Sequence, residues 1–358
     1  MRWLALESSC DETALAVWDT EQRRVLYESV LSQIDIHASY GGVVPGIAIR
    51  EHLKGFPILL EELQKNFDLS AIDALCVTHG PGLIGCIGMG VAYAQSLQLL
   101  LKCPLYGVNH LHGHALSPFV EAFEEDKNFT LEAVCPHLGL LVSGGNTLLF
   151  EMNVEGIPDG SGPKDAVLTG MFSQQFTVHI WAQTVDDAAG EALDKGGKLL
   201  GFPYPGGPLV ERCAQDGDED FVQFPRAFSQ ASELKFSFSG LKTSLRYFLE
   251  KLSPETIEKQ KASICASYQA AVTDALVCKV RQVLRMKNFK SLGVSGGVSN
   301  NQRLRQQLQQ TADRGKIPLF MPKRKYCGDN AVMIAFAAPW VASAVQSNPN
   351  RTLDESGR

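Results

Sequence analysis

Two histidines with the spacing of a metal chelate are the first feature of this sequence that could do chemistry. His110 and His114 stand four positions apart, and on a helix such residues project from the same face, one turn apart. Zinc peptidases of the His-Glu-x-x-His type carry a general-base glutamate directly after the first histidine, and this chain has Leu111 there. His112 points elsewhere on a helix. The pair predicts a metal site, and the alternative is a helix surface with unrelated polar contacts.

A third ligand must come from elsewhere, and Asp329 is the best candidate. It directly precedes the apolar run 331–338 near the C-terminal end of the sequence. A carboxylate completes a mixed ligand set with two imidazoles. The alternative role is an N-cap of the helix that follows, which is a common use of aspartate. Both roles are compatible with one another.

Three apolar segments each end in a turn of small residues, which suits the binding of phosphate. They are Leu4–Leu6 before Glu7-Ser8-Ser9, Leu138–Val142 before Ser143-Gly144-Gly145, and Ser291–Val294 before Ser295-Gly296-Gly297. Such turns leave backbone N–H groups free beyond the strand ends. Any one of them alone is more simply a left-handed turn between strands. Three in one chain favour a nucleotide cleft.

The elements that must position these residues alternate between strands and helices, which predicts an α/β fold. Asn109 is a suitable N-cap for a helix that starts at the histidines. Two later segments are expected to be irregular: an insertion over about 159–176 and a loop over 215–231. The N-terminal part predicts strands at 3–6, 14–18, 25–29, 74–78 and 105–108, with helices at 49–67 and 84–101.

Composition and charge exclude several classes of protein. The 358 residues are 45% hydrophobic and 20% charged, which is typical of a globular enzyme of two or more domains. The net charge of −6 provides no uniform field for nucleic acid. Contacts with RNA must therefore come from local patches. Two are visible: residues 323–325, and a second cluster interpreted as a solvated helix face, formed by Lys279, Arg281, Arg285, Lys287 and Lys290.

Cysteine usage and hydropathy favour a cytoplasmic protein. The nine cysteines contain no Cys-x-x-Cys pair, so neither a disulfide framework nor a thiolate zinc site is expected. The N-terminal apolar run is too short for a signal peptide. No stretch is expected to reach the ~18 to 20 apolar residues of a membrane span.

The chain resembles the bacterial tRNA N6-adenosine threonylcarbamoyltransferase family, long catalogued as O-sialoglycoprotein endopeptidases. The resemblance covers about residues 4–340 and rests on nine strings in a fixed order. They are Leu6–Thr13, Tyr40–Pro45, Gly80–Leu83, Asn109–His114, Asp186–Glu191, Pro203–Pro208, Phe236–Thr243, Gly296–Val298 and Asp329–Asn330.

The resemblance implies an actin- and hexokinase-like α/β fold, with two ribonuclease-H-like lobes around a nucleotide cleft. The expected lobes are residues 1–118 with about 331–358, and residues 119–330. The family's metal ligands correspond to His110, His114 and Asp329. Fe²⁺ is the metal implied, and Zn²⁺ is the alternative that the same ligands would suit.

The family's substrate-binding residues correspond to positions in the second half of this chain. Asn146 departs from the family, which usually has histidine there. Asparagine cannot take up a proton at neutral pH, so an acid or metal role does not carry over. Glu211 is a smaller departure, from aspartate. The corresponding residues are Ser143, Gly144, Gly145, Asn146, Thr147, Asp194, Gly207, Glu211 and Asn301.

The implied reaction is the transfer of a threonylcarbamoyl group from threonylcarbamoyl-adenylate to N6 of adenosine 37, in tRNAs that read codons beginning with A, with release of AMP. The metal is expected to polarise the carbamoyl or phosphate oxygen, and Asp11 or Glu12 to accept the proton of the amine. The family also implies an inactive paralogue as dimer partner and a small ATPase. The alternatives are a metallopeptidase, a small-molecule kinase of the same fold and a non-catalytic scaffold.

Overall fold

The computed structural model describes residues 1–156, 174–228, 233–343, 345 and 350–353. The chain forms two compact units. The first comprises Met1–Cys135, Met152–His179 and Met321–Arg358, and the second comprises Pro136–Glu151 and Ile180–Phe320. The lobe boundaries inferred from the sequence stay a prediction.

The first unit contains a mixed five-stranded sheet, with strand order β3-β2-β1-β4-β5. Its antiparallel part is the expected meander of three strands, and β4 and β5 extend it in parallel. Each expected strand is confirmed, with bounds a few residues wider. The strands are β1 (Arg2–Glu7), β2 (Glu12–Asp19), β3 (Arg24–Ser32), β4 (Ala74–Gly80) and β5 (Leu105–Asn109).

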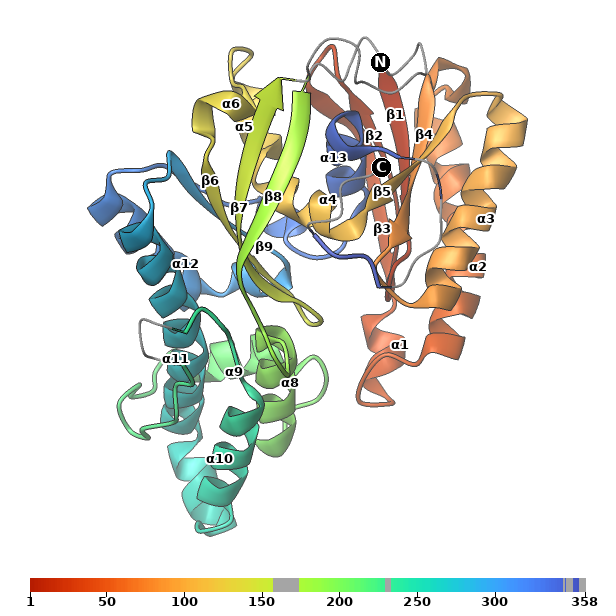
Figure 1. Cartoon of the computed structure of the whole chain (residues 1–358). Helices are drawn as coiled ribbons and strands as arrows, with labels where there is room; N and C mark the ends of the chain where they lie inside the picture. Colours follow the sequence, from red (N-terminus) through yellow and green to blue (C-terminus); the bar gives the residue numbers. More distant parts are fainter. Residues whose placement is uncertain (157–173, 229–232, 344, 346–349, 354–358) are drawn as a thin grey trace. The chain divides into compact units, whose positions relative to one another are not determined.

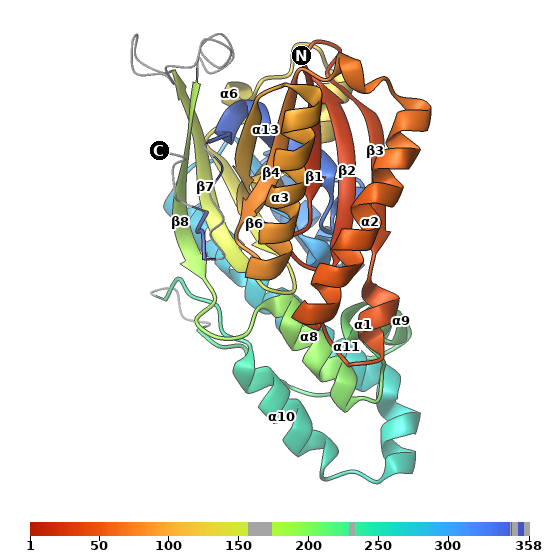
Figure 2. The ribbon, with the colours of Figure 1, turned by 90° about the vertical axis from the view of Figure 1, so that its right-hand side faces the viewer.

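Helices cover both faces of this sheet (Figures 1 and 2). The helix expected at 49–67 begins earlier, at Pro45, and it continues through Pro57 to Asn66. The helices are α1 (Ile34–Ala38), α2 (Pro45–Asn66), α3 (Ile84–Leu101), α4 (His110–Leu116), α5 (Val120–Glu125), α6 (Leu131–Val134) and α13 (Ala331–Val341), with short 3₁₀ turns η1 (Leu69–Ala71), η2 (Ser117–Phe119) and η4 (Arg324–Tyr326).

Successive side chains along a strand point to opposite faces of the sheet, and this alternation decides which helices each residue faces. Leu4, Leu6, Leu15 and Val77 belong to a core cluster with side chains of α2 and α3. The intervening residues face the other side, where Trp18 packs edge-to-face on Phe336 of α13. Glu7 of β1 and Thr78 of β4 alternate with these core residues, as Trp18 does. Their side chains therefore point to the same face of the sheet as Trp18, toward α4 and α13.

Helix α3 corrects the expectation about membrane spans. Its 18 residues have a mean hydropathy of 1.4, so by length and composition this helix could cross a bilayer. A third of it is buried in the structure, where Ile87, Val91 and Leu97 join the core cluster. One such helix is weak evidence for a membrane, because core helices pass the same test.

The second sheet has strand order β10-β9-β6-β7-β8, with β6, β9 and β10 parallel. Of the expected insertion, 159–173 lie outside the described residues, and residues 174–176 belong to β8, so the irregular structure expected for these last three residues is wrong. The elements are β6 (His137–Val142), β7 (Thr147–Gly156), β8 (Gln174–Gln183), β9 (Ser291–Ser295), β10 (Leu319–Phe320), α8 (Ala189–Leu199), α9 (Gly206–Ala214), α10 (Ser239–Leu249), α11 (Pro254–Met286), η3 (Gly297–Asn300) and α12 (Gln302–Gly315).

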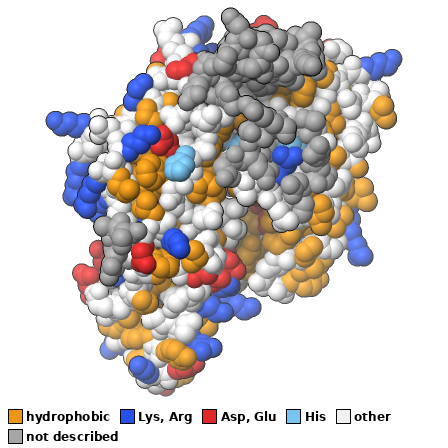
Figure 3. Space-filling model, in the orientation of Figure 1, with side chains coloured by type: hydrophobic (Ala, Val, Ile, Leu, Met, Phe, Trp, Pro, Cys, Tyr) orange, Lys and Arg blue, Asp and Glu red, His pale blue; other side chains and the backbone are white. Residues whose placement is uncertain are grey.

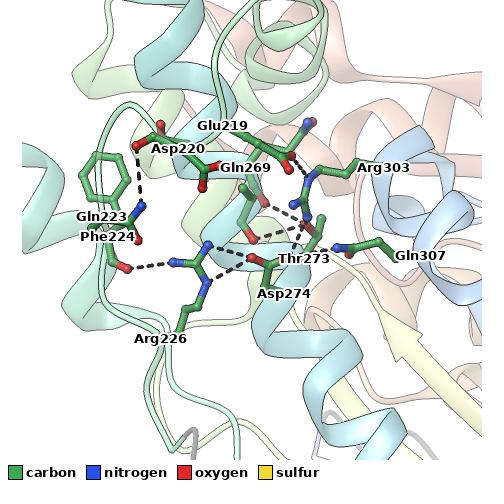
Figure 4. A network of polar contacts seen from close by, with 12 residues as sticks. Glu219, Asp220, Gln223, Phe224, Arg226, Gln269, Thr273, Asp274, Arg303 and Gln307 are labelled. Carbon is green, nitrogen blue, oxygen red and sulfur yellow. Dashed lines mark hydrogen bonds and ion pairs between the residues drawn. The ribbon is translucent and has the colours of Figure 1, made fainter. Parts of the chain in front are cut away.

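A network around Asp274 of α11 holds the loop before α10, which the sequence predicted as irregular (Figure 4). Arg226 of this loop donates through Nε and Nη2 to Oδ2 of Asp274, at 3.0 and 2.6 Å. Arg303 and Gln307 of α12 each donate to Oδ1 at 2.8 Å. One carboxylate thus ties the loop and α12 to α11. Charge-assisted hydrogen bonds of this kind are among the stronger hydrogen bonds in proteins.

The interpretation of the second basic cluster as a solvated helix face is wrong for Lys279. This side chain is 1% exposed, and its ammonium donates to the Glu233 carbonyl at 2.6 Å and to Gln282 at 3.0 Å. Lys287 of the same cluster pairs with Glu151 at 2.6 Å. Burial lowers the pKa of Lys279. This lysine therefore anchors a neighbouring loop and is not available to RNA.

Candidate metal centre

Helix α4 places the two histidines as the sequence predicted. Oδ1 of Asn109, the last residue of β5, accepts a hydrogen bond from the N–H of Leu111 at 2.8 Å and caps the helix. The rings of His110 and His114 lie on one face, with centroids 4.7 Å apart and planes at 87°. Both side chains are almost entirely buried.

Asp329 joins this pair from the segment before α13. Its Oδ1 lies 3.0 Å from Nε2 of His114 and 3.4 Å from Nε2 of His110. The alternative role of Asp329 as the N-cap of α13 is wrong, because Oδ1 of Asn330 accepts the hydrogen bond from Met333 N–H. Asparagine and aspartate cap helices equally well, so the cap falls one residue later and the Asp329 carboxylate turns to the histidines.

Gly113 lets α4 and α13 approach closely enough for this contact. A Cβ at this position would lie 2.9 Å from Cδ1 of Ile334 and 3.1 Å from Cγ of Met333. Separations that short are tighter than ordinary van der Waals contact. The glycine between the histidines therefore favours close packing of α4 on α13, the helix that follows Asp329.

These three residues fit a divalent metal. Their donor atoms lie within 4.8 Å of one another, a grouping found once among the described residues. Two ligands each about 2.1 Å from an ion, at angles between octahedral and tetrahedral, lie about 3.0–3.4 Å apart, as the Nε2–Oδ1 distances do. Nδ1 of His114 is buried without a hydrogen-bond partner in the described part of the chain. The donor set is the two-histidine, one-carboxylate type used by non-haem iron and by zinc.

The electrostatics of the cluster are those of a site for positive charge. Burial raises the pKa of Asp329, but the adjacent His110 and His114 outweigh burial and hold this pKa below its ordinary range. Burial lowers the pKa of His110, and the carboxylates of Asp329 and Glu7 more than reverse this effect. Without an ion, an imidazolium supplies the positive charge that a metal would supply, and metal and proton compete for the same atoms.

His112 is separate from this cluster, as the helical spacing predicted. Its Nε2–H donates to the backbone carbonyl of Leu353 at 2.7 Å, and its ring stands edge-to-face against Phe176. This histidine is buried and its contacts are structural.

Three residues behind His110 were not recognised as part of the site from the sequence. Glu7 Oε2 lies 3.2 Å from Nδ1 of His110, and Ser9 Oγ lies 3.2 Å from the same atom. Thr78 donates a short hydrogen bond to Glu7 Oε2. The available signal was a glutamate that ends a wholly apolar strand, because a carboxylate is rarely buried without partners.

Asp11 lies between β1 and β2, and Glu12 is the first residue of β2; Glu12 faces a cavity that Asp329 also lines. The cavity measures about 410 Å³, and Glu12 and Asp329 both line it. Burial and the nearby carboxylates of Asp329 and Asp11 raise the pKa of Glu12 well above its ordinary value. Asp11 is buried, and its backbone carbonyl accepts a hydrogen bond from Gln33.

In the second unit, Ser143–Thr147 form the turn between β6 and β7. Ser143 Oγ accepts from the N–H of Asn146 at 3.1 Å, and Thr147 Oγ1 accepts from the N–H of Ala189, at the start of α8, at 2.9 Å. A Cβ on Gly144 or Gly145 would meet nothing within 4 Å. The two glycines therefore stand in open space, with room for a ligand against the backbone.

Of the other expected substrate residues, Asp194 and Gly207 contact each other, whereas Glu211 and Asn301 both contact the first turn of α12. Asp194 Oδ1 accepts from the N–H of Gly207 at 2.8 Å, which joins α8 to α9. Burial raises the pKa of Asp194, against the effect of its backbone donors. Glu211 accepts from the N–H of Gln302 at 2.8 Å. Oδ1 of Asn301 caps α12 through Leu304 N–H at 3.0 Å.

The third small-residue turn requires its first glycine. Gly296 has φ +85°, and a Cβ there would lie 2.4 Å from the carbonyl oxygen of Val142. Only glycine adopts this conformation and this approach without strain. The turn after β9 thus packs directly against the end of β6.

Solved structures establish the fold class. The structure resembles HypF from T. kodakarensis, with a TM-score of 0.57 and 15% identity over 94% of this chain and 47% of that chain. A second HypF structure, in a phosphate- and nucleotide-bound form, matches 94% of this chain and 46% of that chain with a TM-score of 0.55 and 12% identity. The expected actin- and hexokinase-like class is confirmed. Fold and site thus define a protein of this class with a group of two histidines and one carboxylate suited to a metal.

Relatives identify the family within this class. The model of the family described as tRNA N6-adenosine threonylcarbamoyltransferase matches residues 24–169 and 161–336. Proteins of that name from Dichelobacter nodosus and Trichlorobacter lovleyi are 41% and 42% identical, over 94% and 95% of this chain and 90% and 92% of their own. The chain belongs to the tRNA N6-adenosine threonylcarbamoyltransferase family. It is an acyltransferase that acts on tRNA, and the recognition from sequence motifs is confirmed.

Proposed function

We propose that the enzyme transfers the threonylcarbamoyl group from threonylcarbamoyl-adenylate to N6 of adenosine 37, in tRNAs that read codons beginning with A, and releases AMP. The observation that carries the proposal is the convergence of His110, His114 and Asp329 beside Glu12. An exocyclic adenine amine is a weak nucleophile because its lone pair is delocalised into the ring. Catalysis must therefore position this amine and accept its proton.

A divalent metal held by His110, His114 and Asp329 would supply Lewis-acid polarisation of a carbonyl or phosphate oxygen of the donor. Two imidazoles and one carboxylate favour Fe²⁺, and Zn²⁺ is the alternative. The buried positions of His110 and His114 limit competition from water for these two ligands.

Glu12 is our candidate for the proton acceptor, in preference to Asp11. Its pKa is raised by burial and by two neighbouring carboxylates, and a base works best when its pKa lies close to the working pH. It also lines the cavity beside Asp329, where an amine could reach it. Asp11 would then act through Glu12, because its carboxylate helps to raise the pKa of Glu12.

The cavity beside Glu12 is our candidate for the acceptor base. Its volume of about 410 Å³ is within the range of small-ligand sites, about 300–1,000 Å³. Val30 and Val332 give it apolar surface, and Glu12, Glu28 and Asp329 give it carboxylates. Adenine is neutral and presents an amino group from which these carboxylates can accept a hydrogen bond.

The donor is assigned to the second unit. The open turn at Gly144 and Gly145 offers backbone N–H groups to a phosphate. Asp194, Gly207, Glu211 and Asn301 carry the remaining contacts implied by the resemblance, together with Ser143, Asn146 and Thr147.

The tRNA contacts and protein partners are further parts of the proposal. Lys323 pairs with Glu121 and Glu124 at 3.3 and 3.7 Å, and Lys325 pairs with Glu28, so the basic cluster at 323–325 is partly neutralised. Figure 3 shows basic and acidic side chains interspersed over the described part of the face that it draws. We therefore propose that an inactive paralogue and a small ATPase assist binding of tRNA, in the cytoplasm.

Helices α2 and α3 support the assignment of a protein partner. Leu53 and Ile58 on α2, and Leu99 and Leu100 on α3, are 57–80% exposed. These helices pack on each other, and exposed large apolar side chains on neighbouring helices are compatible with an interaction surface.

A reconstitution tests the proposal. The full-length chain, its partners, synthetic threonylcarbamoyl-adenylate and an unmodified tRNA transcript are combined, and the digested nucleosides are analysed by mass spectrometry. The modified adenosine is expected with this tRNA and absent when position 37 is guanosine. Formation of the product on the guanosine transcript would contradict the assigned position.

A further inference from the structure

We propose that Glu7 is a positioning residue for the metal centre: its carboxylate fixes the ring of His110 so that Nε2 faces Asp329, and it thereby sets the affinity for the metal. Nδ1 of His110 lies 3.2 Å from Glu7 Oε2, and Nε2 of the same ring lies 3.4 Å from Asp329 Oδ1. The two nitrogens of one imidazole are thus directed at two different carboxylates. The inference rests on the proposed metal site and deepens it.

Glu7 is itself held rigidly. The side chain is fully buried at the end of β1, and its Oε1 accepts a hydrogen bond from the N–H of Ser9 at 2.6 Å. Thr78, on the neighbouring strand β4, donates to Oε2. A carboxylate anchored by a backbone donor and a side-chain donor cannot swing away from the imidazole without leaving buried polar groups unpaired.

The contact with Glu7 determines which nitrogen of His110 carries the hydrogen. An ionised carboxylate only accepts hydrogen bonds, so Nδ1 must be the donor. In the neutral ring, Nε2 then keeps its lone pair toward Asp329, which is the state that a metal requires. Ser9 Oγ lies at the same distance from Nδ1, but a hydroxyl can donate or accept and does not select one tautomer.

The two ligand histidines differ in this respect. Nδ1 of His114 is buried and has no hydrogen-bond partner within the described chain, so a carboxylate supports only His110. Carboxylates behind metal-bound histidines orient the ring and raise its basicity, and their removal weakens metal binding by about 10–100-fold. Loss of the Glu7 carboxylate should therefore weaken metal binding through its effect on one ligand, His110.

The test measures metal affinity directly, with Co²⁺ as the probe and the full-length chain. Affinity is obtained by competition with a chelator, and the electronic absorption of bound Co²⁺ reports its ligand geometry. In Glu7→Gln, binding is expected to weaken by about 10–100-fold and the spectrum to shift. Glu7→Asp keeps the charge but shortens the side chain, and it should recover part of the affinity.

Thr13→Val is the matched control. Thr13 is buried and its Oγ1 contacts Nδ1 of His52 at 2.7 Å, so the variant also removes a buried contact to a histidine, away from the metal ligands. It should change the thermal midpoint of the apoprotein while leaving Co²⁺ affinity within about twofold.

The outcomes separate this inference from the proposed site. If Glu7→Gln and Glu7→Asp both bind Co²⁺ like the parent, with the same spectrum, while His114→Ala does not bind it, the metal site holds and the role of Glu7 is refuted. If His114→Ala binds Co²⁺ as the parent does, the metal site itself is refuted, and the role of Glu7 with it. If Glu7→Gln does not fold, the affinity and spectrum of Glu7→Asp decide.

Discussion

Oδ1 of Asp329 lies 3.0 Å from Nε2 of His114, although the two residues are 215 positions apart in the chain. The contact joins the segment before α13 to the first turns of α4, and His110 reaches the same oxygen at 3.4 Å. An aspartate brought to two buried imidazoles from so far along the sequence gives the site one carboxylate and two imidazole rings. That composition is the basis of the predictions that follow.

Replacement of either ligand histidine should abolish metal binding. His110→Ala and His114→Ala each remove one of three ligands, and we expect activity to fall by at least about 100-fold, since loss of an outer-shell partner alone can cost that much. Metal content after dialysis and the rate of nucleoside formation are the measurements. His112→Asn is the control, because His112 contacts the Leu353 carbonyl, and it should retain the metal. Full metal content in His114→Ala would contradict the assignment.

Substitutions should show that Asp329 acts as a metal ligand and Asn330 as a helix cap. Asn330→Ala removes the cap of α13 and should destabilise the protein by about 0.5–2 kcal/mol, seen as a lower thermal midpoint. Asp329→Ala removes no cap, and in the apoprotein its cost comes only from lost contacts with the histidines, so its main effect should be on metal content. An Asp329→Ala protein that retains the metal after dialysis would overturn the division of roles.

Glu12→Gln should slow the chemical step and spare metal binding. Loss of a general base costs about 10²–10⁴-fold in rate, so kcat should fall while Co²⁺ affinity changes little. Asp11→Asn should have the smaller effect on kcat. Equal losses in both variants would assign the two carboxylates to one shared role, contrary to the preference for Glu12.

A large side chain introduced on β3 should fill the cavity that is assigned to the acceptor base. Val30 is 43% exposed and lines the cavity, so Val30→Trp should occupy the space assigned to the base. The apparent KM for tRNA should rise several-fold, with Co²⁺ affinity unchanged. Val185→Trp, at an exposed position in the second unit, is the control for a surface tryptophan. An unaltered KM in Val30→Trp would place the base elsewhere.

Acidification should destabilise the protein through His137. Burial lowers the pKa of this histidine from 6.5 to about 3. Between these values the unfolded chain binds a proton at His137 that the folded chain does not, so stability falls as pH decreases, by about 1.4 kcal/mol per pH unit. The stabilisation is complete above pH 6.5. In His137→Gln, the thermal midpoint should fall less than in the parent between pH 7 and pH 5; identical falls would contradict this assignment.

Local sequence patterns were sufficient to predict α4 and the position of its histidines. A strand, a capping asparagine and two histidines at helical spacing lie within ten residues, and each signal acts over one or two helical turns. The role of Asp329 was harder to predict, because Asp329 lies next to the start of a helix in the sequence and Asn330 is an equally good cap. Hydrogen-bond geometry separates the two residues, and composition does not.

The contacts of Glu7 could not be predicted from the sequence, for a different reason. Its partner Thr78 comes from β4, and the contact depends on the parallel register in which Leu6 pairs with Val77. Register between strands about seventy positions apart leaves no local pattern in the sequence. Lys279 shows the same limit, since a lysine in a basic run indicates a solvated surface until tertiary contacts show otherwise.

Gly113 constrains any attempt to redesign or reuse this centre. Even an alanine would press on Cδ1 of Ile334 and Cγ of Met333, so these side chains, or the packing of α4 against α13, would have to shift. A residue with no donor atom thus affects the spacing between the imidazoles and the segment that carries the carboxylate. Screens for altered metal preference that randomise only the three ligands would leave this spacing unchanged, whereas screens that include Gly113 would also vary it.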